Sequence, residues 1–265
     1  MVAMNDLSTP YVEVDGRAVD ADPLFLALMG GYGHMTAMQI RDGRVRGLDF
    51  HLTRLDAATK ELFGEGLDGG LVRDRIRRAL GETGVRDASA RVYVYAPEPG
   101  DRTVTAVILR PAVPEPGPQR LRSVPYARPT AHLKHVGVFG QAYHLRRVKA
   151  EGFDEALLVE PDGSVAEGAI TNVGFLEGDT VIWPSAPALD GITMLVLQRE
   201  LDRAGVPWRR QPVRLDEVAR FGAAFACNSV GVSAVPLIDD VRFPPDPEPV
   251  RMLKQLYEAA PWDVI

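Results

Sequence analysis

The chain has 265 residues, of which 46% are hydrophobic and 25% are charged, and its formal net charge is −6. These values are typical of a globular protein of one or two domains, and the negative charge argues against nucleic acid as a main partner. The single cysteine, Cys227, excludes an intramolecular disulfide bond. The sequence shows no signal peptide and no apolar run of about 18 residues. We therefore expect a cytoplasmic protein without a membrane span.

Residues 1–112 are predicted to form a small N-terminal lobe that contains strands and helices. Alternation of apolar and polar residues indicates the strands, and apolar residues at helical spacing indicate the helices. Asp42-Gly43 indicates a hairpin turn, and Gly64 is placed to end a helix. In chain order, the predicted elements are strands at 11–14 and 38–41, helices at 51–63 and 71–80, and strands at 91–95 and 103–109.

Residues 113–130 are predicted to connect this lobe to a larger one. Prolines crowd this stretch and the residues just before it. Because proline lacks a backbone donor, they favour irregular structure over helix or sheet. These prolines are Pro111, Pro114, Pro116, Pro118, Pro125 and Pro129.

Residues 131–265 are predicted to form the large lobe. Its predicted elements are a short strand around Leu133, a helix at 140–151, strands at 155–160, 172–176 and 180–183, a helix at 192–204, strands at 223–227 and 234–238, and a helix at 249–259. The mixture of helices and strands in both halves predicts an α+β fold with two lobes.

Lys134 is the first candidate for chemistry. The other lysines, Lys60, Lys149 and Lys254, lie in amphipathic helix patterns that are typical of exposed side chains. Lys134 instead lies in an apolar-flanked run, His132–Phe139. A lysine that is partly removed from water is a better nucleophile, because its charged form is disfavoured. A surface lysine at the end of a strand is the simpler alternative.

Glu167 is the second candidate. It is the one carboxylate in the otherwise uncharged segment Gly163–Phe175. Placed opposite a pyridine nitrogen, a carboxylate would keep that nitrogen protonated and make the ring an electron sink. A glutamate that faces water at the end of a strand is the alternative.

A candidate phosphate seat lies at Gly191-Ile192-Thr193, where a predicted helix begins. Free N–H groups and the helix dipole favour an anion at such a place. Asp190 is equally well explained as an ordinary helix N-cap. Arg54 could supply a two-point phosphate contact, although an exposed helix arginine is the simpler alternative. A desolvated amine, an apolar-flanked carboxylate and this helix start are the parts needed to hold pyridoxal phosphate (PLP).

Taken in chain order, these segments resemble the class IV (fold type IV) PLP-dependent aminotransferases. This family includes branched-chain and D-amino-acid aminotransferases and aminodeoxychorismate lyase. The resemblance covers most of the chain and implies the two-lobed fold of fold type IV. The matching segments are His51-Leu52-Thr53-Arg54-Leu55, Leu133-Lys134-His135, Gly152-Phe153-Asp154-Glu155-Ala156, Glu167 with Asn172 and Phe175, Leu189-Asp190-Gly191-Ile192-Thr193, Cys227-Asn228-Ser229 and Val235-Pro236.

The resemblance implies a role for each of these residues. Lys134 is expected to form the Schiff base with PLP, and Glu167 is expected to contact the pyridine nitrogen. Arg54 is expected to bind the phosphate. The remaining expected cofactor contacts are Asn172, Ile192, Thr193 and Ser229.

The implied activity is transfer of an amino group between an amino acid and a 2-oxo acid by a ping-pong mechanism. Lys134 would hold PLP as an internal aldimine and then move the proton between the substrate Cα and the cofactor C4′. The first alternative is 4-amino-4-deoxychorismate lyase, which eliminates pyruvate and gives p-aminobenzoate. Lys134-His135 with Gln141, and Cys227-Asn228-Ser229, are similar to that branch.

Three segments depart from the family pattern. The segment that faces the substrate, usually Gly-x-Phe-Glu, reads Gly33-His34-Met35-Thr36-Ala37 here. Met194 replaces the arginine after Gly-Ile-Thr, and Gly137-Val138-Phe139 replaces the asparagine that usually follows the lysine. The first two changes motivate a second alternative, a degenerate relative without catalytic activity.

The resemblance also implies a homodimer whose active site lies near the subunit boundary. His34, Met35 and the proline-rich connector are the candidates for contacts with the partner copy. The expected substrates are small-molecule amino acids and 2-oxo acids. His132, His135 and His144 do not predict a metal site, because no carboxylate or second ligand set is spaced to complete one.

Overall fold

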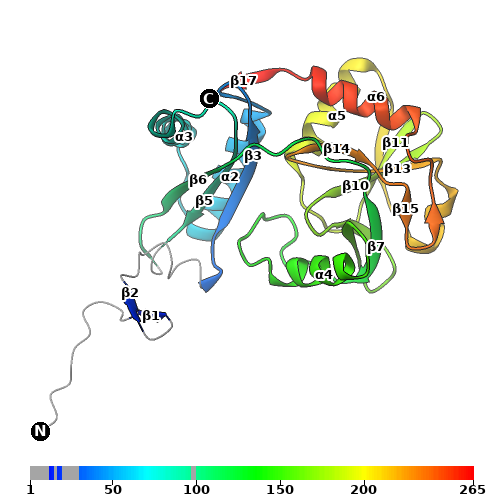
Figure 1. Ribbon diagram of the computed structural model, residues 1–265, viewed down its shortest axis with the longest axis horizontal. Helices are drawn as coiled ribbons and strands as arrows, with labels where there is room; N and C mark the ends of the chain where they lie inside the picture. Colours follow the sequence, from blue (N-terminus) through cyan, green and yellow to red (C-terminus); the bar gives the residue numbers. More distant parts are fainter. Residues whose placement is uncertain (1–11, 15–16, 20–29, 97–99) are drawn as a thin grey trace, which may run out of the picture.

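The computed structural model of the protein describes residues 12–14, 17–19, 30–96 and 100–265. Its elements form two lobes that lie side by side, the first running from β3 to β6 and the second from β7 to α6 (Figure 1). Two short strands, β1 (Val12–Val14) and β2 (Arg17–Val19), pair ahead of the first lobe. Of the strand predicted at 11–14, residue 11 lies outside the described residues.

The small lobe is a three-stranded antiparallel sheet with one face covered by helices. The strand order is β3-β5-β6, with bounds His34–Ile40, Ala88–Tyr95 and Val104–Arg110. Helices α2 (Leu48–Phe63) and α3 (Gly69–Thr83) pack on this sheet around a shared apolar core. Because successive side chains of a strand face opposite sides, every second residue of β3 is buried.

Glycines fix both ends of α2 and its distance from the large lobe. Gly47 has φ 67° and Gly64 has φ 75°, left-handed conformations that favour glycine. A Cβ at Gly47 would lie only 2.8 Å from Val196 Cγ2 of α5 (Ile192–Ala204). The missing side chain therefore lets α2 approach α5 closely. The predicted end of this helix at Gly64 is confirmed.

The large lobe contains two five-stranded sheets around a common apolar core. Their strand orders are β12-β11-β10-β13-β14 and β16-β15-β7-β8-β9. Both sheets contribute to the core, for example through Leu121 and Leu157 of one and Phe175 and Ile182 of the other. The strand bounds are β7 Arg120–Pro125, β8 Glu155–Val159, β9 Val165–Gly168, β10 Asn172–Glu177, β11 Thr180–Pro184, β12 Trp208–Gln211, β13 Ala223–Asn228, β14 Gly231–Ala234, β15 Leu237–Ile238 and β16 Val241–Arg242.

Three helices pack on these sheets. Helices α5 and α6 (Glu248–Ala259) enclose a second apolar cluster with Trp183 and Phe225 of the first sheet. Helix α4 (Phe139–Ala150) packs on the second sheet through Val148. The helices predicted for this lobe are confirmed, with ends that shift by at most one residue. Within the described ranges, no helix is long and apolar enough to cross a membrane.

Three predictions near or in this lobe were wrong, one for the connector and two for strands. Residues 111–119 are irregular as expected, but 120–125 form β7, because Pro125 lies only at the last position of that strand. Leu133 lies in a turn, where its N–H donates over 2.9 Å to Thr130 O, and not in a strand. The strand predicted at 234–238 is divided into β14 and β15, since Pro236 has no N–H to donate.

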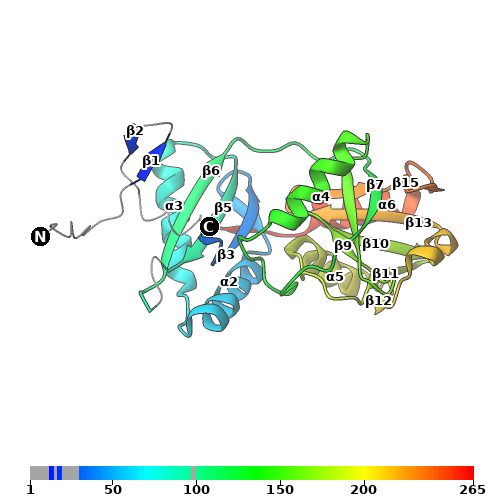
Figure 2. The same cartoon turned by 90° about the horizontal axis from the view of Figure 1, so that it is seen from below.

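The end of the described chain returns to the small lobe. Strand β17 (Trp262–Val264) pairs with β4 (Arg44–Arg46), and Leu48 N donates over 2.9 Å to Asp263 Oδ2. Both views show this segment crossing from α6 to the small lobe (Figures 1 and 2). The lobe limits at 1–112 and 131–265 stay a prediction, and β17 is a part of the second range that packs on the first.

Candidate active site

Lys134 lies in a loop, residues 131–138, that joins the two lobes. Its carbonyl oxygen accepts a hydrogen bond of 2.9 Å from Met35 N. On the far side of His135, Val136 N donates over 3.0 Å to Gly33 O. These two bonds attach the loop to the start of β3, so the position of Lys134 is set by the small lobe as well as the large one.

The side chain of Lys134 is half-buried and surrounded by positive charge. Burial, followed by the charges of Arg54 and Arg128, lowers the pKa of Lys134 from 10.5 to about 8. Glu167 acts in the opposite direction without outweighing them. Near pH 8 a large share of this amine is therefore neutral, which is its nucleophilic form. The simpler interpretation of Lys134 as an ordinary exposed lysine does not fit this environment.

Arg54 extends from α2 to the start of α5. Its Nη2 donates over 2.6 Å to Thr36 Oγ1, and its Nη1 donates over 3.4 Å to the carbonyl oxygen of Asp190. Its Nε is buried and has no partner among the described residues. None of the described carboxylates forms an ion pair with this guanidinium. A partly buried cation with an unused donor is suited to an anionic ligand.

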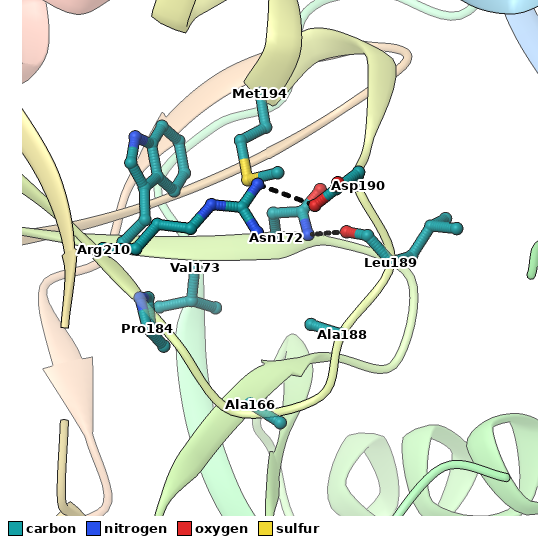
Figure 3. A pocket seen from close by; sticks show the side chains of 10 residues that line it. Ala166, Asn172, Val173, Pro184, Ala188, Leu189, Asp190, Met194 and Arg210 are labelled. Carbon is teal, nitrogen blue, oxygen red and sulfur yellow. Dashed lines mark hydrogen bonds and ion pairs between the residues drawn. The ribbon is translucent and has the colours of Figure 1, made fainter. Parts of the chain in front are cut away.

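The start of α5 is open to an anion. Gly191 precedes the helix with an extended backbone, and no side chain caps the first turn. Asp190 is not the N-cap that the sequence left open, because its Oδ1 accepts a 2.7 Å hydrogen bond from Arg210 Nη2 (Figure 3). The N–H groups of the first turn therefore remain available.

Ile192 and Thr193 reach this opening only through their backbone. Their side chains are buried, and Ile192 packs beside Val196 in an apolar cluster. Thr193 Oγ1 donates over 2.6 Å to the carbonyl oxygen of Asn228. This contact brings the turn between β13 and β14, which contains Ser229, beside the start of α5.

Asn172 holds the loop that precedes α5. Its Nδ2 donates over 2.7 Å to Leu189 O (Figure 3). A Cβ at Gly191 would lie 1.9 Å from Asn172 Oδ1, so only glycine fits there. The side-chain amide of Asn172 is thus engaged by the loop, and any effect of Asn172 on the cofactor would pass through the position of that loop.

Glu167, on β9, forms a buried ion pair with Arg128. Arg128 Nη1 donates over 2.8 Å to Glu167 Oε1, and each side chain is 5% exposed. Arg128 also donates to the carbonyl oxygen of Leu133, next to Lys134. Leu189 N donates over 3.2 Å to Glu167 Oε2. Burial raises the pKa of Glu167, and the charge of Arg128 limits this rise.

Arg128 is a residue that sequence reasoning missed. It lies in Tyr126-Ala127-Arg128-Pro129, within the stretch interpreted as an irregular connector. Two signals could have indicated a role for Arg128. It lies six residues before Lys134, and a buried carboxylate such as Glu167 needs a cation as its partner. The water-facing alternative for Glu167 is wrong, because that side chain is buried and paired.

These groups form one site between the lobes. Hydrogen bonds connect these groups around Lys134. Arg128 donates to Glu167 and to the carbonyl oxygen of Leu133, the neighbour of Lys134. Arg54 donates to Thr36, whose neighbour Met35 donates its N–H to Lys134 O. These residues fit PLP: the Lys134 amine would hold its aldehyde carbon, Glu167 would contact its pyridine nitrogen, and Arg54 with the start of α5 would bind its phosphate. The unpartnered Nε of Arg54 is the observation that fits the phosphate.

The two lobes and this site define the class of protein. The family model "Amino-transferase class IV" matches residues 33–238, which is most of the chain. The protein belongs to the class IV aminotransferase family, whose members are PLP-dependent enzymes. The family, the enzyme class and the cofactor predicted from the motifs are therefore confirmed.

Two curated relatives match different shares of the chain. A probable branched-chain-amino-acid aminotransferase of Rickettsia felis is 28% identical over 85 residues, which are 32% of this chain and 29% of that protein. The chain thus aligns with less than a third of the length of the first curated relatives it matches. The aminodeoxychorismate lyase of Bacillus subtilis is 22% identical over an alignment of 243 residues, and the match covers 83% of this chain and 83% of that protein.

Solved structures share the fold. The crystal structure of the branched-chain aminotransferase of Thermoproteus uzoniensis with norvaline has a TM-score of 0.81 and is 19% identical, and the match covers 92% of each chain. This similarity confirms the predicted α+β architecture of a fold type IV enzyme.

Proposed function

We propose that the protein is an aminotransferase that moves an amino group between an amino acid and a 2-oxo acid in a ping-pong cycle. The observation that carries this proposal is the placement of Lys134. Burial and the charges of Arg54 and Arg128 lower the pKa of its amine to about 8. Its backbone is hydrogen-bonded to Met35, and the neighbouring Leu133 O accepts from Arg128, the ion-pair partner of Glu167. That arrangement matches a reaction at the Cα of an amino acid held by PLP.

Each residue of the site has a part in this proposal. When bound, PLP supplies an electron-withdrawing ring that stabilises negative charge at the substrate Cα. The Lys134 amine would hold the cofactor at its aldehyde carbon, with loss of water, and, once displaced by the incoming amino acid, would carry the proton from the substrate Cα to the cofactor C4′. Glu167 accepts a hydrogen bond from the pyridine nitrogen and holds its proton in place. Arg54, the backbone N–H groups of Ile192 and Thr193, and the Ser229 hydroxyl bind the phosphate.

We further propose that two copies of the chain associate near this site. Apolar side chains are exposed where α4 begins, directly after the Lys134 loop. Phe139 is 82% exposed, Tyr143 47% and Val138 44%. Contiguous exposed apolar side chains are typical of protein interfaces. His34 is not available for such a contact, because it is buried against Thr59. We also propose a cytoplasmic location, which the single cysteine supports because few cysteines are typical of a reducing compartment.

Aminodeoxychorismate lyase activity is the second candidate. The observation that favours it is the coverage of 83% in the match to the Bacillus subtilis lyase. Such an enzyme would use the same Lys134 amine and phosphate seat but would release pyruvate and p-aminobenzoate. A non-catalytic relative is disfavoured, because Lys134, Glu167 and Arg54 are all present and gathered in one site.

Absorbance spectra of the protein with PLP test these candidates. We expect a visible band that disappears with one class of L- or D-amino acid as a 2-oxo acid is formed. Lys134→Ala should lack the band, whereas the control Lys149→Ala, on the exposed side of α4, should retain it. A band that no amino acid changes, with pyruvate released from aminodeoxychorismate, would replace the aminotransferase with the lyase. Absence of a band in the unmodified protein would contradict both.

A further inference from the structure

Next to Arg54, two buried side chains from different elements, Thr36 and His51, are hydrogen-bonded to each other. Thr36, on β3, is 0% exposed, and His51, on α2, is 2% exposed. Thr36 Oγ1 lies 2.6 Å from His51 Nδ1 and 2.6 Å from Arg54 Nη2. The threonine hydroxyl therefore links an imidazole to the guanidinium of the proposed phosphate seat.

The direction of each hydrogen bond follows from the chemistry of the three groups. A guanidinium only donates, so Thr36 Oγ1 must accept from Arg54. The single proton of the hydroxyl then needs an acceptor, and within the described residues that acceptor is His51 Nδ1. His51 is consequently a neutral imidazole with its proton on Nε2. Burial, followed by the positive charges of Arg54 and Lys134, lowers the pKa of His51 well below 6.5, in agreement.

This chain of bonds limits the freedom of the arginine. Thr36 holds Nη2 from the side of the small lobe, and the Asp190 carbonyl oxygen holds Nη1 from the side of the large lobe. Two points fix the plane of the guanidinium, so its remaining donors have set positions before any ligand arrives. A donor set that is ordered in advance binds its ligand more tightly, because less side-chain freedom is lost on binding.

We propose that Thr36, oriented by neutral His51, is a positioning residue that aligns Arg54 for the cofactor phosphate. The proposal rests on the proposed function, since it assumes that the anion bound beside Arg54 is the phosphate of PLP. It assigns a use to Thr36, one of the residues in which this chain departs from the family pattern. Neither Thr36 nor His51 touches the reacting atoms in this account.

The chain offers a matched control on the same two elements. His34 of β3 and Thr59 of α2 form a second buried imidazole–hydroxyl pair, with Nε2 and Oγ1 separated by 3.0 Å. The Thr59 hydroxyl donates over 2.7 Å to Leu55 O and has no contact with Arg54. Thr59→Val thus removes a buried hydroxyl of the same kind from the same interface without touching the phosphate seat.

The test compares two ligands that differ only in the phosphate. The affinity of the apo-protein for PLP and for pyridoxal, which lacks the phosphate, is measured by absorbance titration in wild type, Thr36→Val, Thr36→Ser and Thr59→Val. We expect Thr36→Val to lower the ratio of PLP to pyridoxal affinity roughly tenfold, the size of a lost hydrogen bond to a charged group. Thr36→Ser should restore the ratio, and Thr59→Val should leave it unchanged.

Each remaining outcome has a defined meaning. A Thr36→Val ratio equal to that of wild type, or a Thr59→Val ratio lowered as far, would overturn the positioning role. A wild-type protein that binds PLP no better than pyridoxal would instead contradict the phosphate seat of the proposed function. Should Thr36→Val not fold, the same ratio is measured in His51→Leu, which removes only the acceptor of the Thr36 hydroxyl and should lower the ratio as well.

Discussion

At the α5 end of the site, Arg54 carries a positive charge that no carboxylate of the described residues balances; at the other end, Glu167 and Arg128 balance each other across 2.8 Å. At the α5 end, Arg54 Nε is buried without a partner among the described residues, and no side chain caps the first turn of α5. The Glu167 end is satisfied without a ligand. In the proposed function, the α5 end would therefore supply binding energy for the phosphate, whereas the Glu167 end would fix the protonation state of the pyridine nitrogen.

The largest expected effect is on the free energy of unfolding, and it concerns the Glu167 end of the site. Arg128→Met leaves the Glu167 carboxylate buried without its cation, and we expect this change to lower the free energy of unfolding by about 3–5 kcal/mol. Urea unfolding of the apo-protein measures it. The double variant Arg128→Met/Glu167→Leu should recover most of the loss, since no charge is then left unpaired. A single variant as stable as wild type would show that the pair is not buried as described.

The next effect concerns affinity at the α5 end. Arg54→Met should weaken PLP binding roughly a hundredfold, because a charge-assisted two-point contact is lost. The same variant should not lower the unfolding free energy of the apo-protein, since it removes an unbalanced charge. Titration with PLP and urea unfolding measure the two quantities. Arg203→Met, which changes an exposed arginine of α5, is the control. Loss of stability with unchanged affinity would reverse the assigned roles.

A pH profile of PLP capture compares the effects of Arg54 and Arg128 on the pKa of Lys134. Burial and positive charge lower the pKa of Lys134 to about 8, so the neutral amine accumulates as pH rises through that value. The rate at which the apo-protein captures PLP should therefore rise with pH, with a midpoint at about pH 8. Arg54→Met should move this midpoint upward more than Arg128→Met, because Arg54 has the larger effect on the amine. A wild-type midpoint near 10.5 would contradict the environment described for Lys134.

The smallest effect tests the edge of the phosphate seat. Ser229→Ala removes one neutral hydroxyl from the turn beside α5, and we expect about a fivefold loss of PLP affinity, the size of one ordinary hydrogen bond. Ser185→Ala, at an exposed position before the Leu189 loop, should have no effect. Equal behaviour of the two variants in the PLP titration would remove Ser229 from the seat.

Sequence reasoning succeeded where a signal is local. A glycine after a helical pattern predicts the end of the helix, because glycine readily adopts the left-handed conformation. Helices α2 and α5 do end at Gly64 and Gly205. The motif residues Arg54, Lys134 and Glu167 could be found because a family motif surrounds each of them, although one lies within α2, one in the 131–138 loop and one in β9. Local pattern and tertiary position agree at these residues.

It failed where the deciding partner is distant in the chain. Asp190 has the ordinary look of an N-cap, but its carboxylate pairs with Arg210 on β12, a strand that the sequence did not predict. Arg128 lies among prolines, and its role depends on Glu167, 39 residues away. The hydroxyl of Thr36 has its role only through hydrogen bonds to His51 and Arg54, which lie on the next helix. No periodicity in the chain records such contacts.

We propose above all that Lys134 is the residue that holds PLP between these two ends. The most direct measurement is reduction of the PLP-loaded protein with borohydride, followed by peptide mapping with mass spectrometry. The account predicts that, of Lys60, Lys134, Lys149 and Lys254, only Lys134 gains the mass of the reduced cofactor. A label on any of the other three lysines with Lys134 unmodified would contradict it.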